Sequence, residues 1–163
     1  MASGKTHDLI NLIALPPIVY YFKPEDFVPF TIGYLTGTFF LSPDNDLYHS
    51  KPVQRWKFLK FIWYPLTKFS KHRGLSHIPI IGSLIRLGYL MLILLSLYLL
   101  ILYGAKFFNV SIPFLPPINE TTLKQAVFNI HFISFFLGLV CAEIVHIVVD
   151  IIYSFLKQLR LIR

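Results

Sequence analysis

Residues 87–105 read LGYLMLILLSLYLLILYGA, and residues 126–142 read AVFNIHFISFFLGLVCA. Neither stretch contains Asp, Glu, Lys or Arg. A helix needs roughly 20 mainly apolar residues to cross the ~30 Å hydrocarbon core of a bilayer. Each stretch therefore predicts a transmembrane helix, lengthened by a flank that contains Arg86 in the first case and Glu143 in the second.

Two shorter uncharged stretches precede them, at residues 9–22 and 27–43. Pro16-Pro17 interrupts the first, and Gly33 and Gly37 interrupt the second. We expect two further spans, with a kinked, partly re-entrant hairpin as the alternative. The expected fold is thus all-α, a single membrane-embedded domain over residues 1–163 with a bundle of about four transmembrane helices.

The composition agrees with a membrane protein. Hydrophobic residues make up 55% of the chain and charged residues 14%, and the mean hydropathy is +0.63. An ordinary soluble domain carries about a quarter charged residues, and a disordered chain needs low hydrophobicity and high charge. The single cysteine, Cys141, excludes an intrachain disulfide.

Basic residues predict the orientation. The segment 47–76 contains seven Lys and Arg residues and no acid, and the segment 151–163 contains three and no acid. Loops rich in Lys and Arg stay in the cytoplasm, so four spans would place both termini there. The net charge of +7 then indicates anionic lipid head groups as partners, and no nucleic acid is expected. An oligomer remains compatible with the sequence.

The segment 47–76 also has an internal pattern. Trp56, Leu59, Trp63 and Leu66 recur at helical spacing among basic residues. This pattern predicts a basic amphipathic helix between the second and third spans, lying in the interface with its tryptophans at head-group depth. An irregular polar loop that carries only topology charge is the alternative.

Histidine and aspartate residues gather at four helix ends that this topology places on the cytoplasmic side. The candidate metal ligands are His7, Asp44, Asp46, His72, His77, His146 and Asp150. His146 and Asp150 are four residues apart and so share one helical face. Mixed nitrogen and oxygen ligands favour zinc or manganese, and seven candidates exceed one tetrahedral shell, which slightly favours two ions over one.

Each motif alone has an ordinary interpretation as a turn, a helix cap or a hydrogen-bonded histidine. The prediction of a metal site rests on their joint occurrence at one membrane face. His49 and His131 are interpreted as structural. Residues 3–6 imitate the end of a phosphate-binding loop but lack its earlier glycine and preceding strand, which excludes nucleotide binding.

Arg86 and Glu143 are ionisable residues inside expected spans, where each costs at least ~2.5 to 3.5 kcal/mol on insertion scales. Arg86 follows Ser76 by ten residues, and Glu143 precedes Asp150 by seven, on antiparallel helices. Their similar depth predicts that they are partners.

With these residues the chain resembles a bacterial family of membrane proteins known only as metal-binding, and more loosely the YdjM-like membrane-bound metal-dependent hydrolases. The resemblance extends over nearly the whole chain and is most specific in the block His72-Arg73-Gly74-Leu75-Ser76-His77. A weaker similarity is to the zinc phospholipase C and single-strand nuclease group, which only His146 and Asp150 support by their spacing. The resemblance implies a helical metal-binding protein of the bacterial inner membrane.

The function favoured by these residues is that of a divalent-metal-dependent hydrolase acting at the cytoplasmic membrane face, and the expected substrate is a lipid-linked phosphoester. Asp8 or Asp46 would accept the proton of the attacking water, and Arg73 would bind phosphate, because a guanidinium matches two phosphoryl oxygens. A metal or ion carrier and a noncatalytic scaffold stapled by metal are the alternatives.

Overall fold

The computed structural model describes residues 3–69, 74, 77–110, 124–125 and 127–159. In this part of the chain all regular structure is helical, as expected. The elements are α1 (Gly4–Phe22), α2 (Phe27–Phe39), the 3-10 helix η1 (Pro43–Asp46), α3 (Lys51–Arg55), the 3-10 helix η2 (Lys57–Trp63), α4 (Tyr64–Phe69), α5 (Ile81–Phe107) and α7 (Ile130–Gln158).

Local sequence signals explain where the helices begin and end. Ser3 caps α1 by accepting a hydrogen bond from the Thr6 amide at 3.2 Å, and Asn129 caps α7 by accepting one from the His131 amide at 2.9 Å. Lys23 ends α1 in the left-handed conformation, and a short turn leads back into α2. The structure therefore forms a hairpin from the first two uncharged stretches.

Helices α2 and α7 cross with their backbones in contact. A Cβ atom added at Gly33 of α2 would lie 1.9 Å from the carbonyl oxygen of Phe135, and one at Gly138 of α7 would lie 2.0 Å from that of Phe30. Such close approach is possible only without side chains, which is the packing that small residues allow between membrane helices. This crossing fixes the part of α7 that carries His146 relative to the end of α2.

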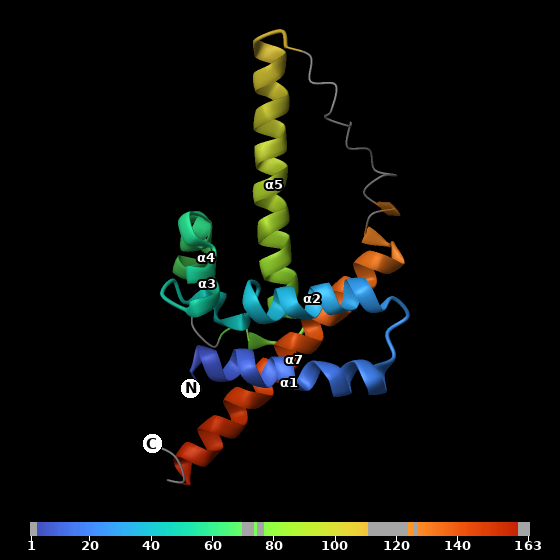
Figure 1. The fold of residues 1–163 in the computed structure, drawn as a ribbon. Coiled ribbons are helices and arrows are strands. Elements are labelled where there is room, and N and C mark those ends of the chain that lie inside the picture. Colours follow the sequence, from blue (N-terminus) through green and yellow to red (C-terminus); the bar gives the residue numbers. More distant parts are fainter. Residues whose placement is uncertain (1–2, 70–73, 75–76, 111–123, 126, 160–163) are drawn as a thin grey trace.

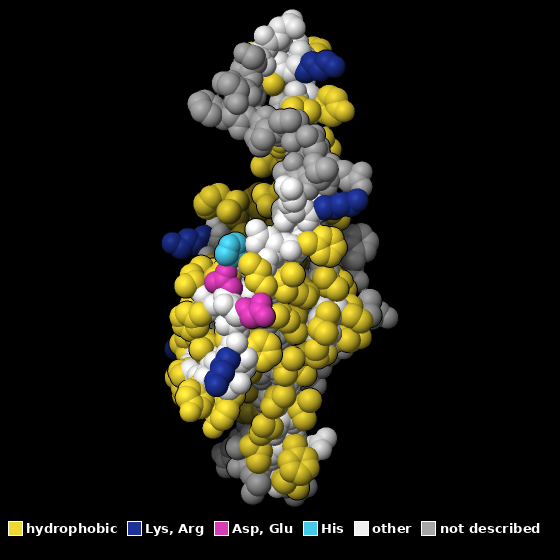
Figure 2. Space-filling view, turned by 90° about the vertical axis from the view of Figure 1, so that its right-hand side faces the viewer, with side chains coloured by type: hydrophobic (Ala, Val, Ile, Leu, Met, Phe, Trp, Pro, Cys, Tyr) yellow, Lys and Arg dark blue, Asp and Glu magenta, His cyan; other side chains and the backbone are white. Residues whose placement is uncertain are grey.

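Helix α5 has a different environment. In Figure 1 it stands upright, away from α1 and α2, which lie crosswise below it, while α7 runs diagonally past them. Of its most apolar stretch only 6% of the residues are buried, against 44% for α7. Figure 2 shows a second face of the molecule, seen from the right-hand side of Figure 1, that is also mainly hydrophobic. Most of the apolar surface of α5 has no partner within the described residues.

The structure gives two candidate membrane spans where the sequence predicted about four. Within the described residues, α5 and α7 are long and apolar enough to cross a membrane. Helix α2 has 13 residues, about 20 Å at 1.5 Å per residue, which is short of the ~30 Å hydrocarbon core. Helix α1 has 19 residues but contains Pro16 and Pro17 and does not meet the same criterion of length and hydropathy.

The segment between the second and third expected spans also differs from the prediction of one amphipathic helix. The segment forms α3, η2 and α4 in succession, so one continuous amphipathic helix is absent from residues 51–69. Trp63 is fully buried and packs in a core cluster with Leu41, Val53 and Leu139, with Trp56 against it. Trp63 is therefore a core residue of the folded chain, with Leu139 of α7 among its neighbours. The interfacial position of the segment stays a prediction.

Candidate metal centre

Six of the seven predicted ligands lie in the described residues, and they come from four separate segments. His7 lies in the first turns of α1, Asp44 and Asp46 form η1, His77 precedes α5, and His146 and Asp150 lie on α7. All but His77 are in the buried class, with exposed fractions of 8% or less. His72 lies outside the described residues.

Their side chains converge. His146 Nε2 lies 3.6 Å from Asp44 Oδ1, and His77 Nε2 lies 4.0 Å from the same oxygen. His7 Nε2 lies 3.3 Å from Asp150 Oδ1. Two groups, His7/Asp44/His146 and His77/His146/Asp150, each offer three ligand atoms within 4.8 Å of one another. The sequence-based expectation that four segments meet is confirmed for these residues.

The unused hydrogen-bonding capacity of the cluster fits a metal ion. Both ring nitrogens of His7, Oδ1 of Asp44 and Nε2 of His146 are buried and make no hydrogen bond with the described residues. Buried polar atoms are almost always paired, so their convergence without hydrogen bonds is what a site for a bound cation would show. Tetrahedral bonds of ~2.1 Å would separate ligand atoms by about 3.4 Å, close to the 3.6 Å between His146 Nε2 and Asp44 Oδ1 of the first group.

The electrostatics of Asp44 agree with that role. Burial raises the pKa of its carboxyl group, but the proximity of His146 and the charge of His7 outweigh this effect and hold the pKa below its ordinary value. The Asp44 side chain is therefore a deprotonated carboxylate, the form that can bind a cation.

Neighbouring groups orient the histidines. The rings of His7 and His146 stack with centroids 3.8 Å apart. Ser42 Oγ lies 3.4 Å from His146 Nδ1, which leaves Nε2 for a metal. The side-chain amide of Asn11 donates a hydrogen bond to the backbone carbonyl of His7 at 3.1 Å. The Tyr34 hydroxyl donates in turn to the backbone carbonyl of Asn11 at 3.0 Å.

Sequence reasoning did not find these supporting residues. One signal was present for Asn11, which lies four residues after His7 and therefore on the same face of an otherwise apolar helix. Ser42, which directly precedes Pro43, carries only the signal of a turn or helix cap, and it does cap η1. Tyr34 carried no signal, because its contact with α1 depends on the hairpin.

The predicted partnership of Arg86 and Glu143 is confirmed. Arg86 Nη2 lies 2.8 Å from Glu143 Oε1, and the Ser83 hydroxyl donates to the other carboxylate oxygen. Each of the three side chains is nearly inaccessible. The charge of Arg86 also acts on Asp46 and Asp44, so this pair connects α5 to the metal cluster.

The proposed catalytic residues have different surroundings. Asp8 makes an ion pair with Arg55, which also donates to the Phe39 carbonyl at 3.1 Å. Asp46 Oδ2 lies 3.7 Å from His77 Nδ1, and the Asp46 side chain is wholly buried. Arg73 lies outside the described residues. Asp46 thus adjoins the cluster, whereas the partner of Asp8 is on α3.

The two histidines interpreted as structural lie apart from the two candidate metal groups. His131, at the beginning of α7, pairs with Asp26 in the turn between α1 and α2. His49 makes an edge contact with the ring of Tyr48.

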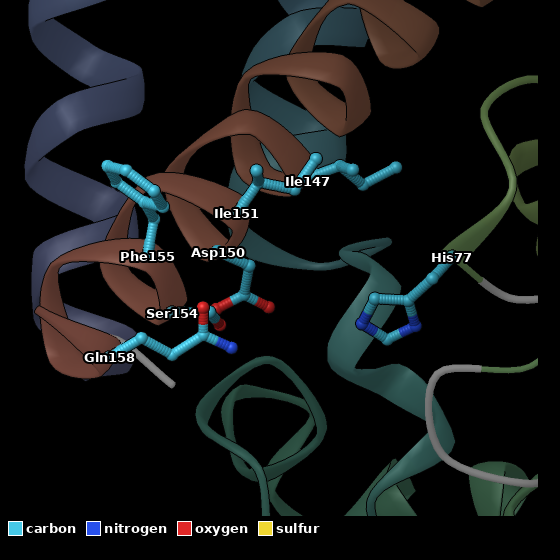
Figure 3. Close-up of a pocket in the computed structure, with 7 residues that line it drawn as sticks. All are labelled: His77, Ile147, Asp150, Ile151, Ser154, Phe155 and Gln158. Carbon is cyan, nitrogen blue, oxygen red and sulfur yellow. The ribbon is translucent and has the colours of Figure 1, made fainter.

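The cluster opens onto a cleft of about 430 Å³, lined by His77, Ile147, Asp150, Ile151, Ser154, Phe155 and Gln158. Figure 3 shows the carboxylate of Asp150 and the ring of His77 facing this space from opposite sides. Two members of the second ligand group therefore border a space that a small molecule can enter.

An all-helical chain with a buried centre of histidine and aspartate ligands belongs to the class of metal-binding proteins. More particularly, the chain belongs to the family of uncharacterized metal-binding proteins DUF2227, whose model matches residues 2–160. An uncharacterized protein of Aquifex aeolicus (strain VF5) is 46% identical, over 83% of this chain and 97% of that protein. No solved structure matches the chain. The looser kinship with YdjM-like hydrolases stays a prediction.

Proposed function

We propose that the protein is a membrane-embedded hydrolase that uses a divalent metal, zinc or manganese, to cleave a phosphoester at the cytoplasmic face. One observation carries the proposal: His77 and Asp150 belong to the ligand cluster and also line the cleft. A metal that only staples helices has its ligand positions closed by protein, whereas a catalytic site keeps access for water and substrate.

His7, Asp44, His77, His146 and Asp150 would hold the metal. When bound, a divalent metal lowers the pKa of water and polarises a phosphoryl oxygen. In the hydrolysis the water oxygen bonds to phosphorus, the bond from phosphorus to the leaving oxygen breaks, and that oxygen takes a proton. Asp46 is placed to hold or move a proton, because its Oδ2 adjoins His77 Nδ1.

The membrane setting is part of the proposal. His77 lies just before α5 and Asp150 lies in the last third of α7, so the cluster is at the same end of both candidate spans. The basic residues of 47–76 and 151–163 favour the cytoplasmic side for that end, in a bacterial inner membrane. Cysteine labels at Lys57 and at Asn109, just beyond α5, should react from opposite sides in a Cys141→Ser background. Labelling of both from the same side would contradict this topology.

Metal content tests the site. The purified protein should contain zinc or manganese by elemental analysis, and His146→Ala should lose it, because His146 belongs to both ligand groups. His131→Ala is the matched control on the same helix and should keep the metal. A wild type that neither carries metal nor takes it up from zinc or manganese buffers would overturn the proposal.

Hydrolysis tests the reaction. Metal-loaded protein should cleave at least one member of a panel of phospholipids, polyprenyl phosphates and aryl phosphates, and His146→Ala should not. A folded, metal-loaded protein that is inactive on the whole panel would favour the stapled scaffold. The scaffold has its own support in the structure, since four chain segments meet at the cluster.

A further inference from the structure

The last turns of α7 present two parallel rows of side chains to the cleft. Asp150, Ser154 and Gln158 follow one another at intervals of four residues, as do Ile147, Ile151 and Phe155. Residues four apart lie on one helical face, and all six line the cleft. Figure 3 shows the polar row and the apolar row side by side along α7, the apolar row beginning at Ile147, nearly one turn before Asp150. The cleft is therefore amphipathic across its width.

The polar row beyond the cluster is uncharged. Apart from His77 and Asp150, which belong to the ligand cluster, the described lining residues carry no ionisable side chain. Ser154 supplies a hydroxyl and Gln158 an amide, which can both donate and accept hydrogen bonds. These groups match the hydroxyls of a ligand and offer no counter-ion to an ammonium group such as that of choline.

The apolar row borders the same space next to the polar row. Ile151 and the ring of Phe155 offer a surface for C–H groups. A ligand that fits both rows needs hydroxyls along one edge and C–H groups along the other, which is the chemistry of a sugar or a polyol. A volume of about 430 Å³ is in the range of small-molecule sites.

We infer that the cleft binds the uncharged, hydroxyl-bearing half of a phosphoester, a polyol or sugar esterified to phosphate. Its hydroxyls lie toward Ser154 and Gln158, and its C–H groups lie against Ile151 and Phe155. The inference rests on the proposed function in that the phosphate faces the metal cluster, and it names the substrate class of that site. The same chemistry occurs in soluble sugar phosphates and in lipids such as phosphatidylglycerol.

Binding to the full-length, zinc-loaded protein in detergent tests the inference without any turnover. The probes for titration calorimetry are glycerol 3-phosphate, glucose 1-phosphate, phosphocholine and inorganic phosphate. Glycerol 3-phosphate and glucose 1-phosphate should bind more tightly than phosphocholine and inorganic phosphate. Gln158→Leu and Ser154→Ala should each lower the affinity for glycerol 3-phosphate about fivefold, as expected for one lost hydrogen bond. Neither change should alter the affinity for inorganic phosphate by more than about twofold. Lys157→Leu, the adjacent residue outside the cleft lining, is the control and should leave all four affinities unchanged.

Two results would overturn the inference. One is that phosphocholine binds as tightly as glycerol 3-phosphate, and the other is that Gln158→Leu lowers the affinity for all four probes equally. Vesicles of phosphatidylglycerol and of phosphatidylcholine form a second arm. Preference for phosphatidylglycerol that Gln158→Leu removes supports a lipid source, whereas selective binding of the soluble probes alone supports a soluble one. Selective binding without hydrolysis of any phosphoester would refute the proposed reaction and leave this inference standing.

Discussion

Helices α5 and α7 have nearly the same length and hydropathy, yet they differ in almost everything else. Helix α7 packs against α2 through backbone contact, carries His146 and Asp150, and holds Glu143 toward the interior. Helix α5 contributes Ser83 and Arg86 near its beginning and then exposes its apolar side chains. Composition alone therefore does not distinguish a helix that builds a site from one that faces its surroundings. Small and polar residues at fixed spacing do distinguish them.

The largest effect is expected when a glycine at the crossing of α2 and α7 is replaced by leucine. Gly33→Leu should prevent folding, which means a loss of at least the ~5 kcal/mol of a marginally stable protein, because the new Cβ would overlap the backbone of α7. Gly104→Leu on α5 is the matched control, since a Cβ there meets nothing within 4 Å. Thermal unfolding in detergent, with size-exclusion profiles, measures both. Equal tolerance of the two changes would show that α2 and α7 do not touch at Gly33.

A smaller effect is expected where α5 and α7 meet. Glu143→Leu alone should cost about 3–5 kcal/mol, because it leaves the Arg86 charge buried without its carboxylate. Adding Arg86→Met should restore part of that stability, since both charges are then gone. A double-mutant cycle on unfolding free energies measures the coupling. Strictly additive losses would mean that the two side chains act independently.

The smallest effect concerns the link between α1 and α3. Arg55→Met should cost about 1 kcal/mol, since its ion pair with Asp8 is partly exposed and such pairs contribute little. Lys5→Met, an exposed position on α1, is the control and should leave unfolding unchanged. A loss as large as that of Glu143→Leu would place the Asp8 pair among the principal supports of the fold.

The sequence predicted the metal cluster better than the arrangement of helices. His146 and Asp150 share a face by spacing alone, and Arg86 and Glu143 could be paired by their depth. The lengths of α1 and α2, the burial of Trp63 and the pairing of Asp8 with Arg55 depend on tertiary contacts. The close approach of Gly33 to Phe135 and of Gly138 to Phe30 could not be predicted from the sequence, and it sets how α2 lies against α7, whose Leu139 packs in the core cluster with Trp63.

Ser83 and Tyr34 illustrate the same limit. Each is one of a few polar residues in a mainly apolar helix, and its spacing does not show which neighbour it meets. Ser83 reaches Glu143 only because α5 passes α7 at that level. Tyr34 reaches Asn11 only because α1 folds back on α2. Patterns along one helix predict its faces, whereas the partner of a face follows from the packing of several helices.

The length of α7 has a consequence in the proposed membrane setting. Its 29 residues extend about 43 Å at 1.5 Å per residue, which exceeds the ~30 Å hydrocarbon thickness. Counted from Ile130, the hydrophobic thickness is used up after roughly 20 residues, which is the level of Asp150. This mismatch places the ligand cluster at the boundary of the hydrocarbon, and the turns that carry Ser154 and Gln158 protrude into the head-group layer, where water and substrate are both at hand.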